Sequence, residues 1–123
     1  MKREMDLIRA ILLEIENRHD GSGSAVTVEI EGYSHEQITE HLFMLREAGF
    51  IEGVDSSHMD GRDIIVLRMT WSGHEFLETV RDPEIWRKTK SVAVVAGGWT
   101  AGILSGIAGG LIKAKLQQLG VAS

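Results

Sequence analysis

The sequence contains no cysteine and only one proline among its 123 residues. Without cysteine, the chain can form neither a disulfide framework nor a thiolate site. The first residues, up to Asp6, lead directly into an amphipathic pattern and do not resemble a signal peptide. We therefore expect a cytoplasmic protein. A chain of this length forms one domain, or one small domain with an appendage.

Acidic residues are absent from the C-terminal third of the chain. Residues 1–84 contain all 18 Asp and Glu but 8 of the 13 Lys and Arg, which gives a net charge of −10. Residues 85–123 contain the other 5 basic residues and no acid, which gives +5. This division, which the overall charge of −5 conceals, is more informative than the net charge itself.

Residues 34–51 carry the clearest helix signal in the sequence. Ser34 can accept a backbone N–H that the first turn leaves unpaired, and Gln37, three positions later, completes the pattern of a capping box. Gly49 stands where a helix commonly ends in a left-handed residue. One helical face is apolar (Ile38, Leu42, Leu45, Ala48). The pattern predicts a capped helix of about four turns followed at once by a strand.

The other elements of the first 90 residues are predicted from periodicity and turn residues. We expect a helix over Arg3–Arg18, and a half-buried strand at Val26–Ile30, where apolar and polar residues alternate. Ile51–Asp55 and Ile64–Thr70 read as the two strands of a hairpin, because Asp60-Gly61 between them favours positive φ angles. Two helices should follow, one capped by Thr70 or Ser72 (Phe76, Leu77 and Val80 buried) and one begun by Asp82-Pro83 (Ile85 and Trp86 buried).

The central stretch resembles the recognition helix of a winged helix-turn-helix, S-x-x-x-(V/I)-x-x-H-L-x-x-L-x-x-A-G-(L/F)-(I/V). The matching residues are Ser34, Ile38, His41, Leu42, Leu45, Ala48, Gly49, Phe50 and Ile51. The predicted fold is α+β, a small winged-helix-like domain over residues 1–90 (helix, strand, helix, β-hairpin wing, helix). A glycine-rich helical segment at residues 91–123 completes the chain. The strand at Val26–Ile30 stands where an ordinary winged helix has a short second helix.

Longer motifs resemble a second family. These are M-K-R-x-M-D-L-I-R at the start, G-Y-S-x-E-x-I-x-x-H-L in the middle, and W-S-G-H-E-F-L-x-x-x-R-D-x-x-x-W-x-K-T-K up to residue 90. They are similar to an uncharacterised family of small phage and bacterial proteins known only as a domain of unknown function. The resemblance implies a phage or prophage origin, and therefore the cytoplasm of a bacterial host as the location. It carries over no activity and no site.

The C-terminal segment contains a long uncharged run with regularly spaced glycines. Val92–Ile112 has 21 residues without a charge, and Gly98, Gly102, Gly106 and Gly110 follow at four-residue spacing. On a helix these glycines would form a groove that lets another helix approach closely. Two interpretations remain open. The segment is either a soluble helix over Thr100–Leu119 that packs on the core or on a second subunit (through Ile103, Leu104, Ile107, Leu111 and Ile112), or it spans or lies in a bilayer.

The sequence offers few candidates for chemistry. His35, Glu36 and His41 do not form a zinc site, because a separation of six residues places the two histidines about 240° apart around a helix. We expect His41 to be a packed residue. His58, Asp60 and Asp63 at the predicted wing tip could hold a cation, but a polar hairpin loop is the simpler interpretation. We expect no enzyme activity, no metal and no cofactor.

DNA binding would use the exposed positions of the central helix and the wing (His35, Glu36, Gln37, Thr39, Glu40, Arg46 and Arg62). Gln37 and Arg46 could read bases or phosphates. However, Glu36 and Glu40 would face the groove beside them, and the −10 charge lacks the basic footprint that duplex affinity depends on. The main hypothesis is a non-enzymatic protein-interaction module that self-associates and modulates a host or phage protein. The alternatives are a DNA-binding regulator and a small membrane-associated protein.

Overall fold

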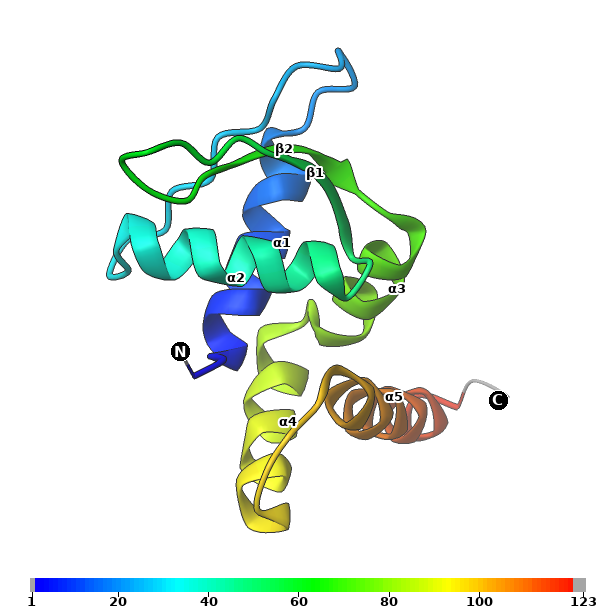
Figure 1. Ribbon diagram of the computed structural model, residues 1–123. Coiled ribbons are helices and arrows are strands. Elements are labelled where there is room, and N and C mark those ends of the chain that lie inside the picture. Colours follow the sequence, from blue (N-terminus) through cyan, green and yellow to red (C-terminus); the bar gives the residue numbers. More distant parts are fainter. Residues whose placement is uncertain (1, 121–123) are drawn as a thin grey trace. The chain divides into compact units, whose positions relative to one another are not determined.

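A computed structural model describes residues 2–120 and confirms the α+β class (Figure 1). The described residues form five helices and one two-stranded sheet. In chain order they are α1 (Met5–Arg18), α2 (His35–Glu47), β1 (Ile51–Asp55), β2 (Ile64–Met69), α3 (Trp71–Val80), α4 (Pro83–Ala96) and α5 (Ala101–Gln118). Backbone contacts group them into two compact units, one extending to His74 and one starting at Glu75. This division lies within α3, and the predicted boundary at residues 90/91 lies within α4 and remains a prediction.

The first unit is built from α1, α2 and the β1–β2 hairpin, and α1 packs against both α2 and β2. The apolar face predicted for α1 forms the centre of its core, where Leu7, Ile11, Leu12 and Ile15 have no exposed surface. Ile38, Leu42 and Leu45 of α2 and Ile51, Val66 and Met69 of the hairpin are also buried. The helix-strand-strand-helix order therefore places a wing-like hairpin directly after α2.

Helix α2 begins and ends as the sequence predicts. The Ser34 hydroxyl accepts the Gln37 backbone N–H at 3.1 Å, and the Gln37 side chain accepts the Ser34 N–H at 2.9 Å. This reciprocal capping box is formed in full. Gly49 has φ +83°, so the chain leaves the helix in the left-handed conformation and enters β1 two residues later.

The wing is the antiparallel pair β1–β2, with a bulge between Glu52 and Gly53. At its tip His58 pairs with Gly61, which leaves Met59 and Asp60 as the central residues of the turn. Gly61 has a positive φ, as predicted, but Asp60 does not. The hairpin therefore turns one residue earlier than the Asp60-Gly61 dipeptide suggested.

The predicted strand at Val26–Ile30 is wrong as a full strand. Only Val26 pairs with the sheet, through its N–H to the Val66 carbonyl at 2.8 Å. Burial still alternates along the segment, with Val26 buried, Val28 and Ile30 half-buried and the residues between them exposed. The alternation of apolar and polar residues therefore predicted correctly which side chains are buried. Within the described residues, however, no strand pairing extends past Val26.

In the second unit α5 packs against α4. Asp82 caps α4 ahead of Pro83, and the predicted inward residues Ile85 and Trp86 are buried. The uncharged run Val92–Ile112 is not one helix. Helix α4 ends at Ala96, Gly97 is left-handed at φ +88°, and Thr100 caps a new helix, α5. Nowhere in residues 2–120 is there a helix both long and apolar enough to cross a membrane.

Candidate interaction groove between α2 and the wing

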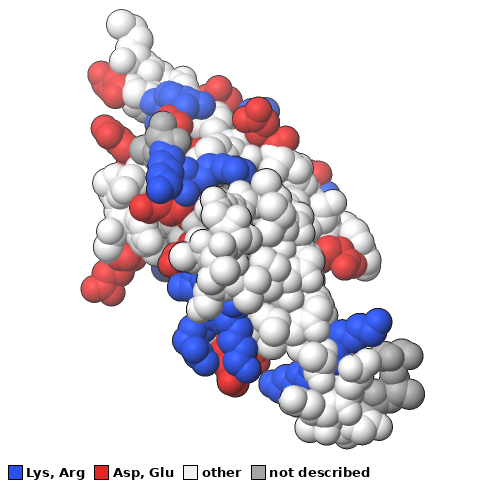
Figure 2. Space-filling view, turned by 90° about the horizontal axis from the view of Figure 1, so that it is seen from below, with Lys and Arg blue, Asp and Glu red and all other residues white. Residues whose placement is uncertain are grey.

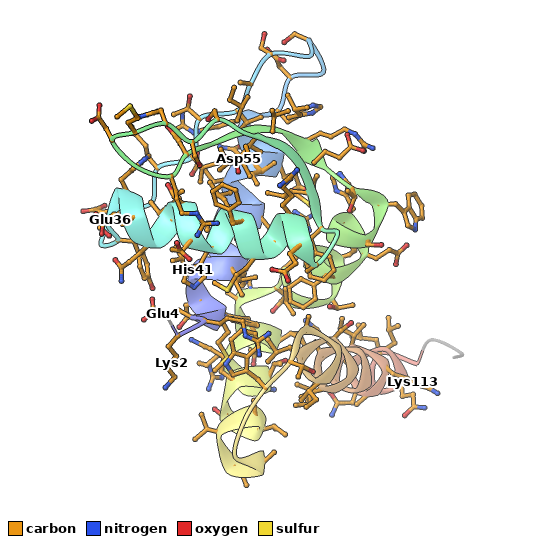
Figure 3. The ribbon with its side chains drawn as sticks, viewed as in Figure 1. Lys2, Glu4, Glu36, His41, Asp55 and Lys113 are labelled. Carbon is orange, nitrogen blue, oxygen red and sulfur yellow. The ribbon has the colours of Figure 1, made fainter. Side chains whose placement is uncertain are left out.

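The exposed face of α2 and the tip of the wing enclose a groove of about 620 Å³. The helix contributes side chains from its first two turns, and the wing contributes those around its turn. Glu36, labelled in Figure 3, lies at the N-terminal end of α2 in this region. The lining residues are His35, Glu36, Thr39, Glu40, His58, Asp60, Gly61, Arg62 and Asp63. Two segments that are about 20 residues apart in sequence thus form one surface.

The groove is acidic. Its lining contains four carboxylates and one arginine, a net charge of −3 with both histidines neutral. The arginine, Arg62, is already paired with one of these carboxylates, because its guanidinium donates a hydrogen bond to Glu40 at 2.6 Å. It also lies 4.1 Å from the centre of the Phe43 ring, close enough for a cation–π contact. Glu36 and Asp60 are exposed, so they can meet a cationic group from outside.

Besides the Arg62–Glu40 hydrogen bond, a longer contact between His35 and Asp63 links the two sides of the groove. His35 Nε2 lies 3.4 Å from the Thr39 hydroxyl and 3.9 Å from a carboxylate oxygen of Asp63, across from α2. That Asp63 oxygen also accepts the backbone N–H of Ile64 at 2.8 Å. The pair His35–Asp63 becomes an ion pair when the imidazole is protonated.

The wing is ordered from within by Ser57. Its side chain and its backbone N–H, which donates to Asp55 at 2.9 Å, lower the pKa of Asp55 below its usual 3.8. The hydroxyl of Ser57 also exchanges hydrogen bonds with the backbone of Asp63. Asp55 therefore keeps its negative charge in the folded protein to lower pH than a free carboxylate does.

The predicted recognition surface is only partly assembled. His35, Glu36, Thr39, Glu40 and Arg62 line the groove. Thr39 was predicted to be exposed, but this is wrong, because its side chain points toward the core side of α2 and is only 4% exposed. Gln37 does not, because its side-chain oxygen completes the capping box of α2. Arg46 is exposed in the last turn of α2 and is not among the lining residues. The two residues expected to read bases or phosphates are thus the two that the groove leaves out.

His41 is buried, as expected, and has a structural role that the sequence did not reveal. Figure 3 shows it on the side of α2 that faces Glu4 at the start of α1. Its Nδ1 lies 2.8 Å from the Gln37 carbonyl oxygen, so Nδ1 carries the proton, since a carbonyl can only accept. Its Nε2 then accepts the backbone N–H of Glu4 at 3.0 Å. One neutral imidazole thus ties the start of α1 to α2.

The wing-tip residues His58, Asp60 and Asp63 do lie in one groove, together with His35. They do not assemble into a metal site, since the described residues contain no group of three or more His, Cys, Asp or Glu side chains placed to hold an ion. The imidazole of His58 instead accepts the backbone N–H of Asp60 at 3.3 Å. The spacing of these residues predicted their proximity, but the loop hydrogen bond was not predictable from it.

The glycine row is divided between two elements. Gly102, Gly106 and Gly110 lie in α5, whereas Gly98 lies in the connection before it. All four are exposed, and an added Cβ at Gly98, Gly106 or Gly110 would meet open space. Of the apolar residues predicted to pack, Leu104 is buried, Ile107, Leu111 and Ile112 are half-buried, and Ile103 is 46% exposed. The glycines therefore lie on the face of α5 that its own chain leaves uncovered.

Comparison with known proteins gives a family but no activity. No solved structure matches this chain. A protein of Haemophilus influenzae, described as uncharacterized, is 36% identical over 91 residues, which cover 74% of this chain and 77% of that relative. The family described as "Hypothetical protein (DUF2513)" matches residues 2–99, which include everything from α1 through α4. The chain therefore belongs to this uncharacterised domain-of-unknown-function family.

Proposed function

We propose that this protein is a non-enzymatic interaction module whose α2–wing groove binds a basic segment of another polypeptide. The observation that carries the proposal is the charge of the groove. Four carboxylates line the position where a DNA-binding winged helix would present basic side chains, and the one arginine is paired with Glu40. An exposed ion pair contributes about 0.2–1 kcal/mol, so several carboxylates acting together can select a partner rich in Lys and Arg.

The resemblance to small phage and bacterial proteins supports a phage or prophage origin. The partner would then be a protein of the phage or of its bacterial host, and binding would modulate that protein. A duplex-binding regulator is the alternative function. The acidic groove disfavours it, because phosphate contacts provide most of the affinity for DNA.

Self-association through α5 is the second part of the proposal. The outward face of this helix presents Gly102, Gly106 and Gly110. Nothing lies within 4 Å of an added Cβ at Gly106 or Gly110, and only the Thr100 hydroxyl lies near Gly102, at 3.8 Å. Such a face lets the backbone of a second helix approach closely. Replacing Gly102 and Gly106 together by Leu should lower the oligomer mass measured by light scattering. A mass that stays the same in this variant would rule out the glycine face as the contact.

The groove itself is tested with a fluorescent Lys/Arg-rich peptide of about twelve residues, titrated with the full chain. Glu36→Gln combined with Asp60→Asn removes two exposed carboxylates without touching a core residue. We expect the peptide affinity to fall roughly two- to thirtyfold, and to fall with added salt as well. Glu47→Gln, which neutralises an exposed carboxylate of α2 outside the groove, is the matched control and should leave the affinity unchanged. Equal losses in both variants, or no peptide binding at all, would contradict the proposal.

A further inference from the structure

The last turn of α4 presents an unusual surface, because it is apolar and yet exposed to solvent. Val92, Val94 and Val95 are 45%, 72% and 88% exposed, and Ala96 and Gly97 beside them are exposed as well. Ala93 is the one buried residue of this turn. Ten large hydrophobic side chains are exposed in the described part of the chain, and six of them lie between residues 92 and 119. A gathered apolar surface of this kind marks a contact with another molecule or with a membrane.

The shape of the second unit makes this turn accessible. Figure 1 shows the connection after Gly97 running back along α4 to reach α5, so that the end of α4 projects beyond the helix packed against it. We call Val92–Gly97 the apolar tip. It is reached from the side as well as from the end, because its three valines point in different directions around the helix at 100° per residue.

A group of basic side chains lies just behind the apolar tip. Arg87, Lys88 and Lys90 precede it on the same helix, and Lys88 to Val94 is six residues, or about 9 Å of helix. Arg87 and Lys88 are exposed; Lys88 lies 3.5 Å from Glu84, and Lys90 lies over the Trp86 ring. Glu84 offsets one of the three charges and leaves a net +2 around this part of α4. From residue 85 on, the chain contains no acid to repel an anionic partner.

This order of residues matches the layers of an anionic lipid surface. An interfacial helix buries its apolar part about 5–10 Å into the boundary between headgroups and acyl chains, while Lys and Arg remain at the headgroups. A second copy of this chain would fit less well, because two apolar tips would bring two sets of positive charges together with no acidic residue of the same segment to pair with them. Figure 2 shows a broad area without charged side chains, with Lys and Arg side chains (blue) beside it.

We propose that the apolar tip of α4 docks the protein on anionic membranes, with Val94 and Val95 inserted at the interface and the basic side chains behind them at lipid phosphates. This surface is separate from the α2–wing groove, so the two proposals can fail independently. Membrane docking would concentrate the interaction module at the lipid surface without requiring a helix that crosses the bilayer.

The test is co-sedimentation of the full chain with vesicles of phosphatidylcholine alone or with one quarter phosphatidylglycerol. We expect binding to the anionic vesicles that decreases with salt, and little binding to the neutral ones. Val94→Asp with Val95→Asp should weaken binding at least tenfold, and Arg87→Gln with Lys90→Gln roughly fivefold for each basic residue removed. Val54→Asp changes a valine of β1 that is 51% exposed and lies outside the apolar tip, and this variant should bind like the unchanged protein.

Three results would overturn the proposal. The first is no binding to either vesicle by the folded full chain. The second is equal binding to neutral and anionic vesicles, which would remove the role of the basic residues. The third is a change of oligomer mass in the Val94/Val95 variant, measured by light scattering, with lipid binding unaltered. This last result would assign the apolar tip to a second copy of the chain.

Discussion

The buried imidazole of His41 allows a sharp test of how the first unit is held together. His41 is 1% exposed and bridges two helices, accepting the Glu4 N–H at Nε2 and donating to the Gln37 carbonyl from Nδ1. The N-cap residue of α1, Glu4, has no capping hydrogen bond from its own side chain. The backbone N–H of Glu4 is paired with His41, a residue 37 positions away in the sequence.

Replacing His41 by Leu keeps a buried side chain of similar size but removes the acceptor. Leaving a fully buried donor unpaired costs about 1–3 kcal/mol, but Glu4 is exposed and its hydrogen bond is only part-buried, so we expect a loss of about 1 kcal/mol in the free energy of unfolding. That loss corresponds to roughly a fivefold change in the ratio of folded to unfolded protein. His41→Gln places an amide oxygen near the position of Nε2, so it should restore the acceptor and cost less than the Leu substitution.

Urea denaturation followed by circular dichroism measures both variants. With a slope of about 1–3 kcal/mol per molar urea, the Leu variant should unfold at roughly 0.3–1 M less urea than the unchanged protein. Hydrogen exchange gives a second readout, because the Glu4 amide should lose its protection in the Leu variant and keep it in the Gln variant. If Leu proved as stable as His, or if Gln proved no better than Leu, His41 would be a space-filling residue and the bridging argument would be refuted.

Three further predictions concern single positions. Gly73→Ala should destabilise the protein by about 1–3 kcal/mol in the same urea assay, because its Cβ would lie 2.2 Å from the Phe50 carbonyl oxygen. In protein dilute enough to be monomeric, Gly106→Ala should instead stabilise α5 by up to about 1 kcal/mol, because its Cβ meets open space within one chain. At concentrations where the chain self-associates, the same variant should lower the oligomer mass measured by light scattering, because the added methyl group stands where the second helix approaches. Glu36→Ala and Arg46→Ala should leave duplex DNA affinity unchanged in a fluorescence anisotropy titration. A salt-dependent, site-specific complex at sub-micromolar protein would favour the DNA-binding alternative.

Local signals in the sequence predicted most of the secondary structure. The capping box of Ser34, the left-handed Gly49 and the Asp82-Pro83 start of α4 are all formed. Each of these signals acts over a few residues, so it can be recognised without knowledge of the fold. The segment Val26–Ile30 shows the limit. Its alternation predicted which side chains are buried, but whether a partner strand runs alongside depends on distant parts of the chain.

The sequence predicted which residues line the candidate groove better than how they pair. The pairs join residues that are far apart in the sequence. The helix side could be chosen from the exposed positions of α2, and the wing tip from its polar loop. The pairing of Arg62 with Glu40 spans 22 residues and decides whether the groove has a free cation for phosphate. Gln37 has a similar ambiguity, since the same amide could cap the helix or read a base. The sequence predicted the capping box, and in the structure the Gln37 amide oxygen accepts the Ser34 N–H that completes it.

Helix α5 presents a conflict between local preference and tertiary structure. Four of its residues are glycine, each costing about 1 kcal/mol relative to alanine within a helix. At Gly106, Gly109 and Gly110 an added methyl group would meet nothing, so within one chain the glycines provide no close packing in return. Alanine at these positions would be compatible with the described fold and more favourable for the helix. A local rule broken without compensation in the fold points to function, and here the compensation would come from a second helix that approaches the bare backbone. The oligomer mass of the Gly102/Gly106 variant decides whether that helix belongs to a second copy.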